Sequence, residues 1–293
     1  MGLTNRSASQ GRHAAAGAAE ALTSLLSLGR PLVMGILNVT PDSFSDGGRF
    51  FAPDAAIAQA HRMVAEGADI IDIGAESTRP YGSAVPVGAE EELRRLEPVM
   101  VALTDLGVPI SIDTMKAEVA EHAIAAGARI VNDVWGLQRD PAMAAVVARH
   151  RVPVIVMHNR TAADPELDIM VDIAAFFVRS LDIAAQAGVD RAHIVLDPGI
   201  GFGKTQDQSI TVLARLAELE GFGLPLLIGA SRKRFIDHVS PAPPDRRLGG
   251  SLAAHLAAAA HGARIIRTHD VAETVQALRV AAAIGDATIR DSR

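Results

Sequence analysis

Three polar side chains of this sequence form the set that a planar nitrogen heterocycle needs. A ring with an amino-pyrimidinone edge presents N–H donors beside carbonyl and ring-nitrogen acceptors, so its pocket needs a carboxylate, an amide and a cation at fixed places. Asp197, Asn132 and Lys233 supply this set. A carboxylate can accept two parallel N–H bonds, which makes Asp197 the best candidate for the edge of such a ring. We expect these residues to meet in one pocket.

A second group of residues, near the C-terminus, predicts an anion site. Arg267 and His269 come just before an expected helix, whose first N–H groups and dipole also favour negative charge. A diphosphate can be bound there by both side chains and the helix end. His158 and His255 are interpreted as ordinary polar or core histidines, because no HExxH or comparable metal-ligand spacing appears.

The segment 198–205, PGIGFGKT, is close to the phosphate-binding P-loop pattern but does not match it. The pattern requires a glycine where Pro198 stands, and the segment follows the sixth predicted strand. Its glycines are better explained by a backbone that passes close to a flat ligand, with Phe202 as an apolar surface.

The elements that must position these residues follow one repeated pattern. From Pro31 onward a short run rich in Val and Ile, a polar ending and a longer Ala-rich helical pattern recur eight times. Each short run is almost continuously apolar, as parallel strands buried on both faces should be. Eight such units favour a closed (β/α)8 TIM barrel over an open doubly wound sheet, which usually has about six parallel strands. The predicted strands are Leu32–Val39, Ile70–Gly74, Ile110–Asp113, Arg129–Asp133, Val154–His158, His193–Asp197, Leu226–Gly229 and Arg264–Arg267, and the predicted helices are Asp54–Glu66, Ala89–Leu106, Lys116–Ala126, Pro141–Arg149, Asp172–Ala187, Gln208–Leu219, Leu248–His261 and Val271–Ala283.

Residues 31–293 are expected to form a single α/β domain, because no linker or composition shift divides them. Residues 1–30 are rich in Ala, Ser and Gly and are expected to form a short flexible N-terminal extension. A short amphipathic helix over Ala18–Leu28 is the alternative. No membrane-spanning segment is predicted.

The carboxyl ends of the strands carry the active site in barrels of this class. All eight predicted strands end in a hydrogen-bonding or charged side chain, whereas the opposite junctions are mostly Gly-Ala, Gly-Val-Pro or Arg-Val-Pro. One such residue alone, such as Asp113, is equally well explained by capping of the next helix. Eight around one rim, with cations among them, favour a binding site. The strand ends hold Asn38, residues 76–79, Asp113, Asn132, Asp133, His158, Asp197, residues 231–233, Arg267 and His269.

The composition narrows the class of partner. The formal net charge is −6 and no basic run occurs, which argues against a nucleic-acid surface but allows a local cationic pocket. The sequence has no cysteine, which excludes disulfides, thiolate metal sites and a cysteine nucleophile and favours the reducing cytoplasm. We therefore expect a small-molecule ligand, and neither a nucleic-acid nor a membrane partner.

The loop after the first predicted strand is the most informative segment. Residues 35–48, GILNVTPDSFSDGG, carry two Asp, two Ser and a Thr, more polar groups than a plain connection to a helix needs. This segment resembles the first signature of the dihydropteroate synthases, folate-pathway enzymes that join 4-aminobenzoate to a pterin diphosphate. Residues 72–80, DIGAESTRP, resemble the second signature. The resemblance extends from Pro31 to the C-terminus, with the motifs in order on the expected strand ends.

The resemblance implies roles for residues on this rim. Asp113, Asn132 and Asp197 would bind the pterin, and Arg267 and His269 the diphosphate. Magnesium would be held with the diphosphate by one protein ligand, Asn38, because Mg²⁺ prefers oxygen ligands and keeps several waters. The predicted catalytic residues are Asp113, Lys233, Arg267 and His269. The predicted substrate-binding residues are Phe44, Thr78, Arg79, Pro80, Asp113, Asn132, Asp197, Phe202, Ser231, Lys233, Arg267 and His269.

The family's reaction also explains why no nucleophile and base pair is evident. An arylamine is unprotonated at neutral pH, so it needs no strong general base. Catalysis would come from charge stabilisation at the departing diphosphate and from positioning of the two substrates.

Departures from the signatures leave alternatives open. Ala75 stands where the second signature usually has Gly, and Tyr81 where Gly commonly follows Arg-Pro. One alternative is a paralogue that binds pterin with weak or no synthase activity. Another is a pterin-dependent methyltransferase-type barrel, which would not need Arg267 and His269. The family is typically dimeric and the small-residue segment 249–260 can pack closely, so a homodimer is expected.

Overall fold

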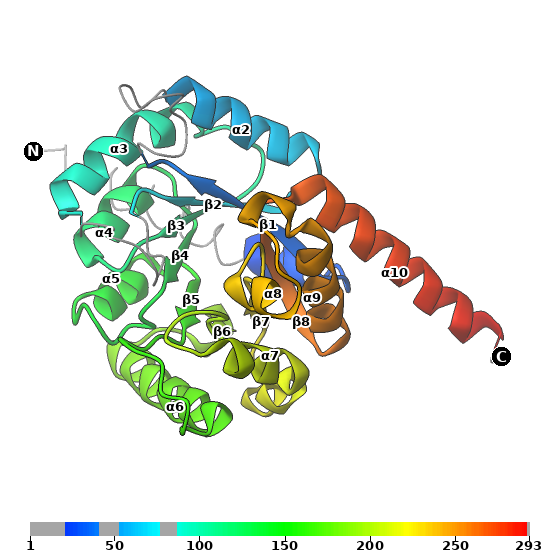
Figure 1. The fold of residues 1–293 in the computed structure, drawn as a ribbon. Helices are drawn as coiled ribbons and strands as arrows, with labels where there is room; N and C mark the ends of the chain where they lie inside the picture. The colour runs from blue at the N-terminus through cyan, green and yellow to red at the C-terminus, as the bar shows by residue number, and fades with distance from the viewer. Residues whose placement is uncertain (1–20, 41–52, 77–86, 292–293) are drawn as a thin grey trace, which may run out of the picture.

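The computed structural model describes residues 21–40, 53–76 and 87–291, and in them the chain forms a closed barrel (Figure 1). Parallel strands pair in the order of the sequence, and β1 closes the barrel against β8. The predicted TIM barrel is confirmed, and the predicted strand ends differ from the observed ones by at most one residue. The strands are β1 (Leu32–Asn38), β2 (Ile70–Gly74), β3 (Ile110–Asp113), β4 (Ile130–Asp133), β5 (Val154–Met157), β6 (Ile194–Asp197), β7 (Leu226–Ile228) and β8 (Ala263–Thr268).

A ring of helices surrounds the barrel (Figure 1). Among the described helices, none is long and apolar enough to cross a membrane. The helices are α2 (Pro53–Ala65), α3 (Ala89–Ala102), α4 (Ala117–Ala125), α5 (Met143–His150), α6 (Ile169–Ala187), α7 (Gln206–Ala214), α8 (Arg234–Val239), α9 (Leu248–Ala260) and α10 (Val271–Asp291).

Several helices differ from the sequence-based expectation: α3 ends at Ala102 rather than Leu106, and α10 continues to Asp291 rather than ending at Ala283. α6 begins before the predicted residue because the carboxylate of Asp168 caps it, accepting the Met170 N–H at 3.0 Å. The helix predicted to continue to Leu219 ends at Ala214 and is followed by a 3₁₀ helix, Leu216–Phe222. α8 was not predicted, because its six residues are too few to show a helical period.

The outward faces of the strands form the larger part of the core. Side chains alternate between the two faces of a strand, so Ile71 and Ile73 point toward the helices while their neighbours point into the barrel. Both are fully buried, as is Val154 on β5. Burial of each such side chain stabilises the fold by roughly 1.5–3 kcal/mol.

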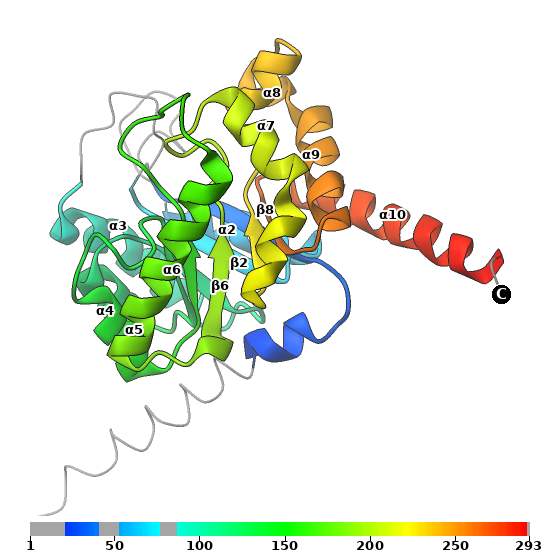
Figure 2. The same ribbon diagram turned by 90° about the horizontal axis from the view of Figure 1, so that it is seen from below.

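A separate apolar layer fills the inside of the barrel near the amino ends of its strands. The layer consists of Leu22, Leu32, Met34, Ile70, Ile130, Ile155, Val195, Leu227 and Ile265. Leu22 belongs to the helical residues 21–26, which lie at the end of the barrel opposite α8 (Figure 2). The side chain of Leu22 is 3% exposed, and Arg264 Nη2 donates to the Leu26 carbonyl at 2.5 Å.

Within the expected N-terminal extension, residues 21–30 thus make specific contacts with the barrel. These residues pack against the barrel because its amino-terminal end is open, and Leu22 there buries an apolar side chain that would otherwise face water. Arg30 adds an ion pair, with Nη2 at 2.7 Å from Asp69 Oδ1. The described part of the alternative helix over Ala18–Leu28 is observed, since residues 21–26 are helical.

Candidate active site

The inward-facing positions change from apolar to polar along the barrel axis. Residues in register on parallel strands point to the same face, and a residue two positions further along a strand does so again. The strand registers therefore place one set of side chains inside the barrel, next to the apolar layer and toward the carboxyl ends. This set is Ile36, Asp72, Asp113, Asn132, Met157, Asp197 and Arg267.

Arg267 lies at the centre of a buried ion-pair network within this set. Its Nε donates to Asp72 Oδ2 at 2.6 Å and its Nη2 to Asp113 Oδ2 at 2.7 Å. Asn132 Nδ2 donates to the same Asp72 oxygen at 3.0 Å. The side chains of Asp72 and Asp113 are 0% and 7% exposed, so both ion pairs are shielded from water. The network ties together side chains from β2, β3, β4 and β8.

Three buried oxygens of this network have no hydrogen-bond partner within the described residues. They are Asp72 Oδ1, Asp113 Oδ1 and Asn132 Oδ1. An unpaired buried acceptor costs about 1–3 kcal/mol, so a protein gains when a ligand supplies donors to it. A flat ring that carries several N–H groups matches three acceptors on one rim.

Burial changes the acidity of two carboxyl groups on the rim. It raises the pKa of Asp113; the guanidinium of Arg267 opposes this shift and the carboxylate of Asp72 adds to it. Burial raises the pKa of Asp197 to about 6, although its Oδ1 accepts the Gly199 N–H at 2.7 Å. At neutral pH Asp197 is therefore mostly a carboxylate, able to accept N–H groups.

An apolar cluster lies beside these polar groups. It contains Val134, Met157 and Phe202, with Met115 and Trp135 packed against it. The Lys233 ammonium lies 4.1 Å from the centre of the Phe202 ring, close enough for a cation–π interaction. The site thus offers an apolar face and a cation next to buried acceptors, as a planar heterocycle requires.

Ser231 and His269 form a pair at the ends of β7 and β8. Ser231 Oγ accepts the backbone N–H of His269 at 3.2 Å and lies 3.0 Å from His269 Nδ1. The hydroxyl hydrogen is then best donated to Nδ1, which leaves the ring proton on Nε2 for a ligand. Burial lowers the pKa of His269 to about 3, and the guanidinium groups of Arg267 and Arg232 add to the shift. His269 is therefore neutral and offers one N–H.

Comparison with known proteins agrees with this arrangement. Residues 34–269 match the family model described as pterin binding enzyme. The dihydropteroate synthase of Bacillus subtilis (strain 168) is 49% identical to this chain over 243 residues, which cover 83% of this chain and 84% of the relative. The chain belongs to the dihydropteroate synthase family. The resemblance seen in the sequence is thereby confirmed, and this member of the family is a transferase.

Solved structures of the family share the barrel. The dihydropteroate synthase of Xanthomonas albilineans with 4-aminobenzoic acid superposes with a TM-score of 0.83 at 46% identity, covering 87% of this chain and 93% of that chain. A structure from the same organism in complex with 7,8-dihydropteroate gives a TM-score of 0.79 at 45% identity, covering 87% and 94%.

The structure brings together most of the residues that the sequence predicted for this family's site. Asn38 is half-buried at the end of β1. It pairs with Gly74 of β2, and Gly74 pairs in turn with Asp113 of β3, so Asn38 and Asp113 lie at the same level of the barrel. The predicted residues Phe44, Thr78, Arg79 and Pro80 lie outside the described residues. The residues found at this end of the barrel are Asn38, Asp113, Asn132, Asp197, Phe202, Ser231, Lys233, Arg267 and His269.

The described residues offer few ligands of the kind that magnesium prefers. No group of three or more His, Cys, Asp or Glu side chains in the described residues could hold a metal ion by itself. Asn38 supplies one amide oxygen at the rim, and Mg²⁺ is commonly bound through one or two protein oxygens together with substrate phosphates and waters. The residues present therefore fit a magnesium ion that binds with the diphosphate.

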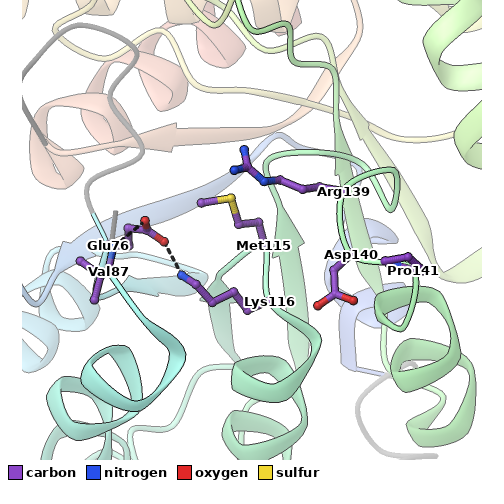
Figure 3. A pocket seen from close by; sticks show the side chains of 7 residues that line it. All are labelled: Glu76, Val87, Met115, Lys116, Arg139, Asp140 and Pro141. Atoms are coloured by element: carbon purple, nitrogen blue, oxygen red, sulfur yellow. Dashed lines mark hydrogen bonds and ion pairs between the residues drawn. The ribbon is translucent and has the colours of Figure 1, made fainter. Parts of the chain in front are cut away.

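A pocket of about 300 Å³ lies beside this site, between the ends of β2, β3 and β4 (Figure 3). One of its cations is held by two carboxylates: Lys116 Nζ contacts Glu76 Oε2 at 2.5 Å and Glu92 Oε2 at 2.7 Å. Asp140 accepts the Ala117 N–H at 2.8 Å and so caps α4. Among the predicted substrate residues that the structure describes, none lines this pocket.

Sequence reasoning missed two residues of the site. Asp72 lies within the second signature without an assigned role, and Met157 lies within the fifth predicted strand without one. A charged residue inside an otherwise apolar strand is itself a signal, because a buried charge persists where it is paired. Asp72 follows two isoleucines and precedes a third, and its partner is Arg267.

Proposed function

We propose that this rim binds 6-hydroxymethyl-7,8-dihydropterin diphosphate and condenses it with 4-aminobenzoate, giving 7,8-dihydropteroate and diphosphate. Membership of the dihydropteroate synthase family supports the reaction. The structures from Xanthomonas albilineans were solved with 4-aminobenzoic acid and with 7,8-dihydropteroate, which are a substrate and the product of this reaction.

The observation that carries the proposal for this chain is the set of buried unpaired acceptors. Asn132 Oδ1 and Asp113 Oδ1 lie on the rim without partners among the described residues, and a dihydropterin has ring and exocyclic N–H groups to give them. Asp197 would accept two parallel N–H bonds from the aminopyrimidinone edge. Phe202 and Met157 would pack against the ring.

The diphosphate would lie near the amino end of α10. The guanidinium of Arg267 carries five N–H groups, of which Asp72 and Asp113 take two. His269 would donate through Nε2, so it contributes a hydrogen bond rather than a charge. The dipole of α10 favours negative charge at this end.

In the proposed step the nitrogen of 4-aminobenzoate attacks the exocyclic methylene of the pterin. A C–N bond forms as the C–O bond breaks and diphosphate leaves with the electron pair, and the nitrogen then releases one proton to the solvent. Arg267 and His269 would stabilise the negative charge that develops on the leaving diphosphate, while the Asp113 carboxylate would offset the positive charge that develops on the pterin. When bound through Asn38, magnesium would neutralise part of the diphosphate charge.

The proposal is tested by incubating the purified chain with magnesium, the pterin diphosphate and 4-aminobenzoate while following both products. Coupled appearance of diphosphate and dihydropteroate is the expected result. Diphosphate release without dihydropteroate would place the defect at the aminobenzoate site. Pterin binding without either product would overturn the proposal in favour of the binding paralogue.

We also propose that the chain is a homodimer. The later part of α10 projects from the barrel (Figure 1), and Val280 and Ile284 are 55% and 64% exposed on it. These residues are four positions apart and therefore share one face of the helix. A second copy of the chain would bury them.

The reducing cytoplasm is the proposed compartment, since the sequence has no cysteine.

A further inference from the structure

Lys204 is a buried cation that the proposed reaction does not use. Its side chain is 1% exposed, at the end of the segment that resembles a P-loop without matching it. The ammonium donates to the Phe202 carbonyl at 3.1 Å and lies 2.7 Å from His158 Nδ1. Both contacts hold the turn that connects β6 to α7.

The contact with His158 continues into a hydrogen-bonded chain toward the surface. His158 Nε2 lies 3.0 Å from Asp172 Oδ2, and Arg160 Nη1 donates to the same oxygen at 3.0 Å. Burial and the nearby Lys204 lower the pKa of His158 to about 3, so the ring is neutral. Its proton then belongs on Nε2, where Asp172 accepts it, and Nδ1 is the acceptor for Lys204.

The inner end of this chain reaches the residues proposed to bind the pterin. Within the turn, the Gly199 N–H is donated to Asp197 Oδ1 at 2.7 Å, and the His158 backbone N–H is donated to the Asp197 carbonyl at 2.8 Å. The ring of Phe202 lies under the Lys233 ammonium. The contacts of Lys204 and His158 therefore hold the turn segment that carries both Asp197 and Phe202.

The turn is packed too tightly to rearrange locally. Gly199 has φ +67°, and a Cβ there would lie 2.0 Å from the His158 carbonyl oxygen. Gly203 has φ +54°, and a Cβ there would lie 2.4 Å from Arg160 Cβ. The turn therefore depends on the β5–α6 connection beneath it, which Lys204 joins to it through His158.

Packing alone does not explain a lysine at this position. A buried ammonium is costly, and an apolar side chain of similar length would fill the space at lower cost. Burial lowers the pKa of Lys204 to about 7, while the carboxylates of Asp197 and Asp172 favour its charged form. A buried amine that is held by two directional contacts, to His158 and to the Phe202 carbonyl, points to a use in positioning.

We propose that Lys204 is a positioning residue of the pterin pocket, which holds the β6–α7 turn so that Asp197 and Phe202 receive the pterin ring in one geometry. The inference rests on the proposed function, because it takes the pterin as the ligand of Asp197. It assigns Lys204 no contact with the reacting atoms. His158 accepts the hydrogen bond of Lys204, and Asp172 orients His158 for that contact.

The test is direct binding of 6-hydroxymethylpterin, which lacks the diphosphate, measured by titration calorimetry on the full chain. Lys204→Met removes the ammonium and keeps the length of the side chain. We expect its Kd for the pterin to rise by about tenfold or more, equivalent to roughly 1.4 kcal/mol. The KM for the pterin diphosphate should rise similarly, with a smaller change in kcat, because ground-state and transition-state binding are weakened together.

Thr205→Ala is the matched control. Thr205 caps α7 through a capping box and its side chain contacts Gln208, so its loss should lower Tm without changing the pterin Kd. A Lys204→Met chain that is less stable yet binds the pterin within about twofold of wild type would overturn the inference.

A second variant decides the matter if Lys204→Met does not fold. Asp172 is 19% exposed, and Asp172→Ala removes the acceptor that orients His158. A weaker pterin affinity for this variant supports the inference, and an unchanged one refutes it. Wild-type protein that fails to bind the pterin would instead contradict the proposed function, so the two failures are distinguishable.

Discussion

Asp197 combines a destabilising charge with a binding role. Its pKa of about 6 in the folded chain lies above the ordinary value of 3.8, because burial disfavours the carboxylate. The folded state therefore holds this proton more tightly than the unfolded state does. The stability that the protonated group contributes is complete below pH 3.8 and is lost as the pH rises through about 6.

We expect Asp197→Asn to raise the free energy of unfolding at pH 7.5 by up to roughly 3 kcal/mol, because the amide has a similar shape and no charge to desolvate. Near pH 4 the gain should almost vanish. Urea denaturation at the two pH values measures it. The same variant should bind pterin more weakly. A variant that is less stable than wild type at pH 7.5 would show that burial is not what sets this pKa.

Arg267 stabilises both the network of the site and, in the proposed step, the leaving group. We expect Arg267→Ala to lower turnover by about 10- to 100-fold, since it removes a charge-assisted contact worth about 1.5–3 kcal/mol. Steady-state kinetics at saturating magnesium measures this. Arg215→Ala is the control, because Arg215 pairs with Glu218 on the surface, where both side chains are about half exposed. Near-normal turnover of Arg267→Ala would exclude the proposed role.

At the scale of the elements, the barrel was predictable because its signals are local. A buried parallel strand shows as a short run of Val and Ile, and a helix of ten or more residues shows its period. α8 shows neither an apolar run nor a helical period, and the Pro-rich stretch after it has the composition of a loop. Asp168 caps α6 from before the predicted start, a feature that a helical period does not reveal.

The site was predictable where polar residues follow strand ends, and not where they lie inside strands. Asp113 and Asp197 end their strands and Asn132 is the last residue but one of β4, so the barrel rule alone gathers them. Asp72 lies in the middle of β2, and its pairing with Arg267 joins residues that are 195 positions apart. Such a contact follows from closure of the barrel, which no local pattern encodes.

The β6–α7 turn allows a test with two similar glycines. Gly199 and Gly223 have φ +67° and +64°, but a Cβ at Gly199 would lie 2.0 Å from the His158 carbonyl oxygen while one at Gly223 has no atom within 4 Å. We expect Gly223→Ala to cost about 1–2 kcal/mol, the left-handed conformation alone. Gly199→Ala should cost clearly more, because backbone must move. Urea denaturation compares them, and equal costs would show that the turn is not tightly packed.

At the scale of the whole molecule, the projecting part of α10 predicts the oligomeric state. A double variant with Val280→Glu and Ile284→Glu places two charges on the exposed apolar face of the helix. We expect it to be monomeric at concentrations where wild type is dimeric, because a buried unpaired carboxylate is costly. Light scattering after size-exclusion chromatography measures the mass. Val178→Glu, on α6 and 51% exposed, is the control. A double variant with the mass of wild type would place the interface elsewhere.

The two ends of the barrel divide stability from chemistry. The apolar layer with Leu22 lies near the amino ends of the strands, and the polar rim lies at the carboxyl ends. Changes in the layer should therefore alter the free energy of unfolding without altering catalysis.

We expect Leu22→Ala to lower the free energy of unfolding by about 2–4 kcal/mol, because it leaves a cavity at the end of the barrel. Leu28→Ala, at a side chain that is 55% exposed, should change it by less than about 0.5 kcal/mol. Urea denaturation measures both, and kcat and KM at a temperature where both variants are folded should match wild type. If Leu22→Ala changed KM for the pterin diphosphate, the layer would be coupled to the rim through the strands, and the division of the barrel into a stabilising end and a chemical end would fail.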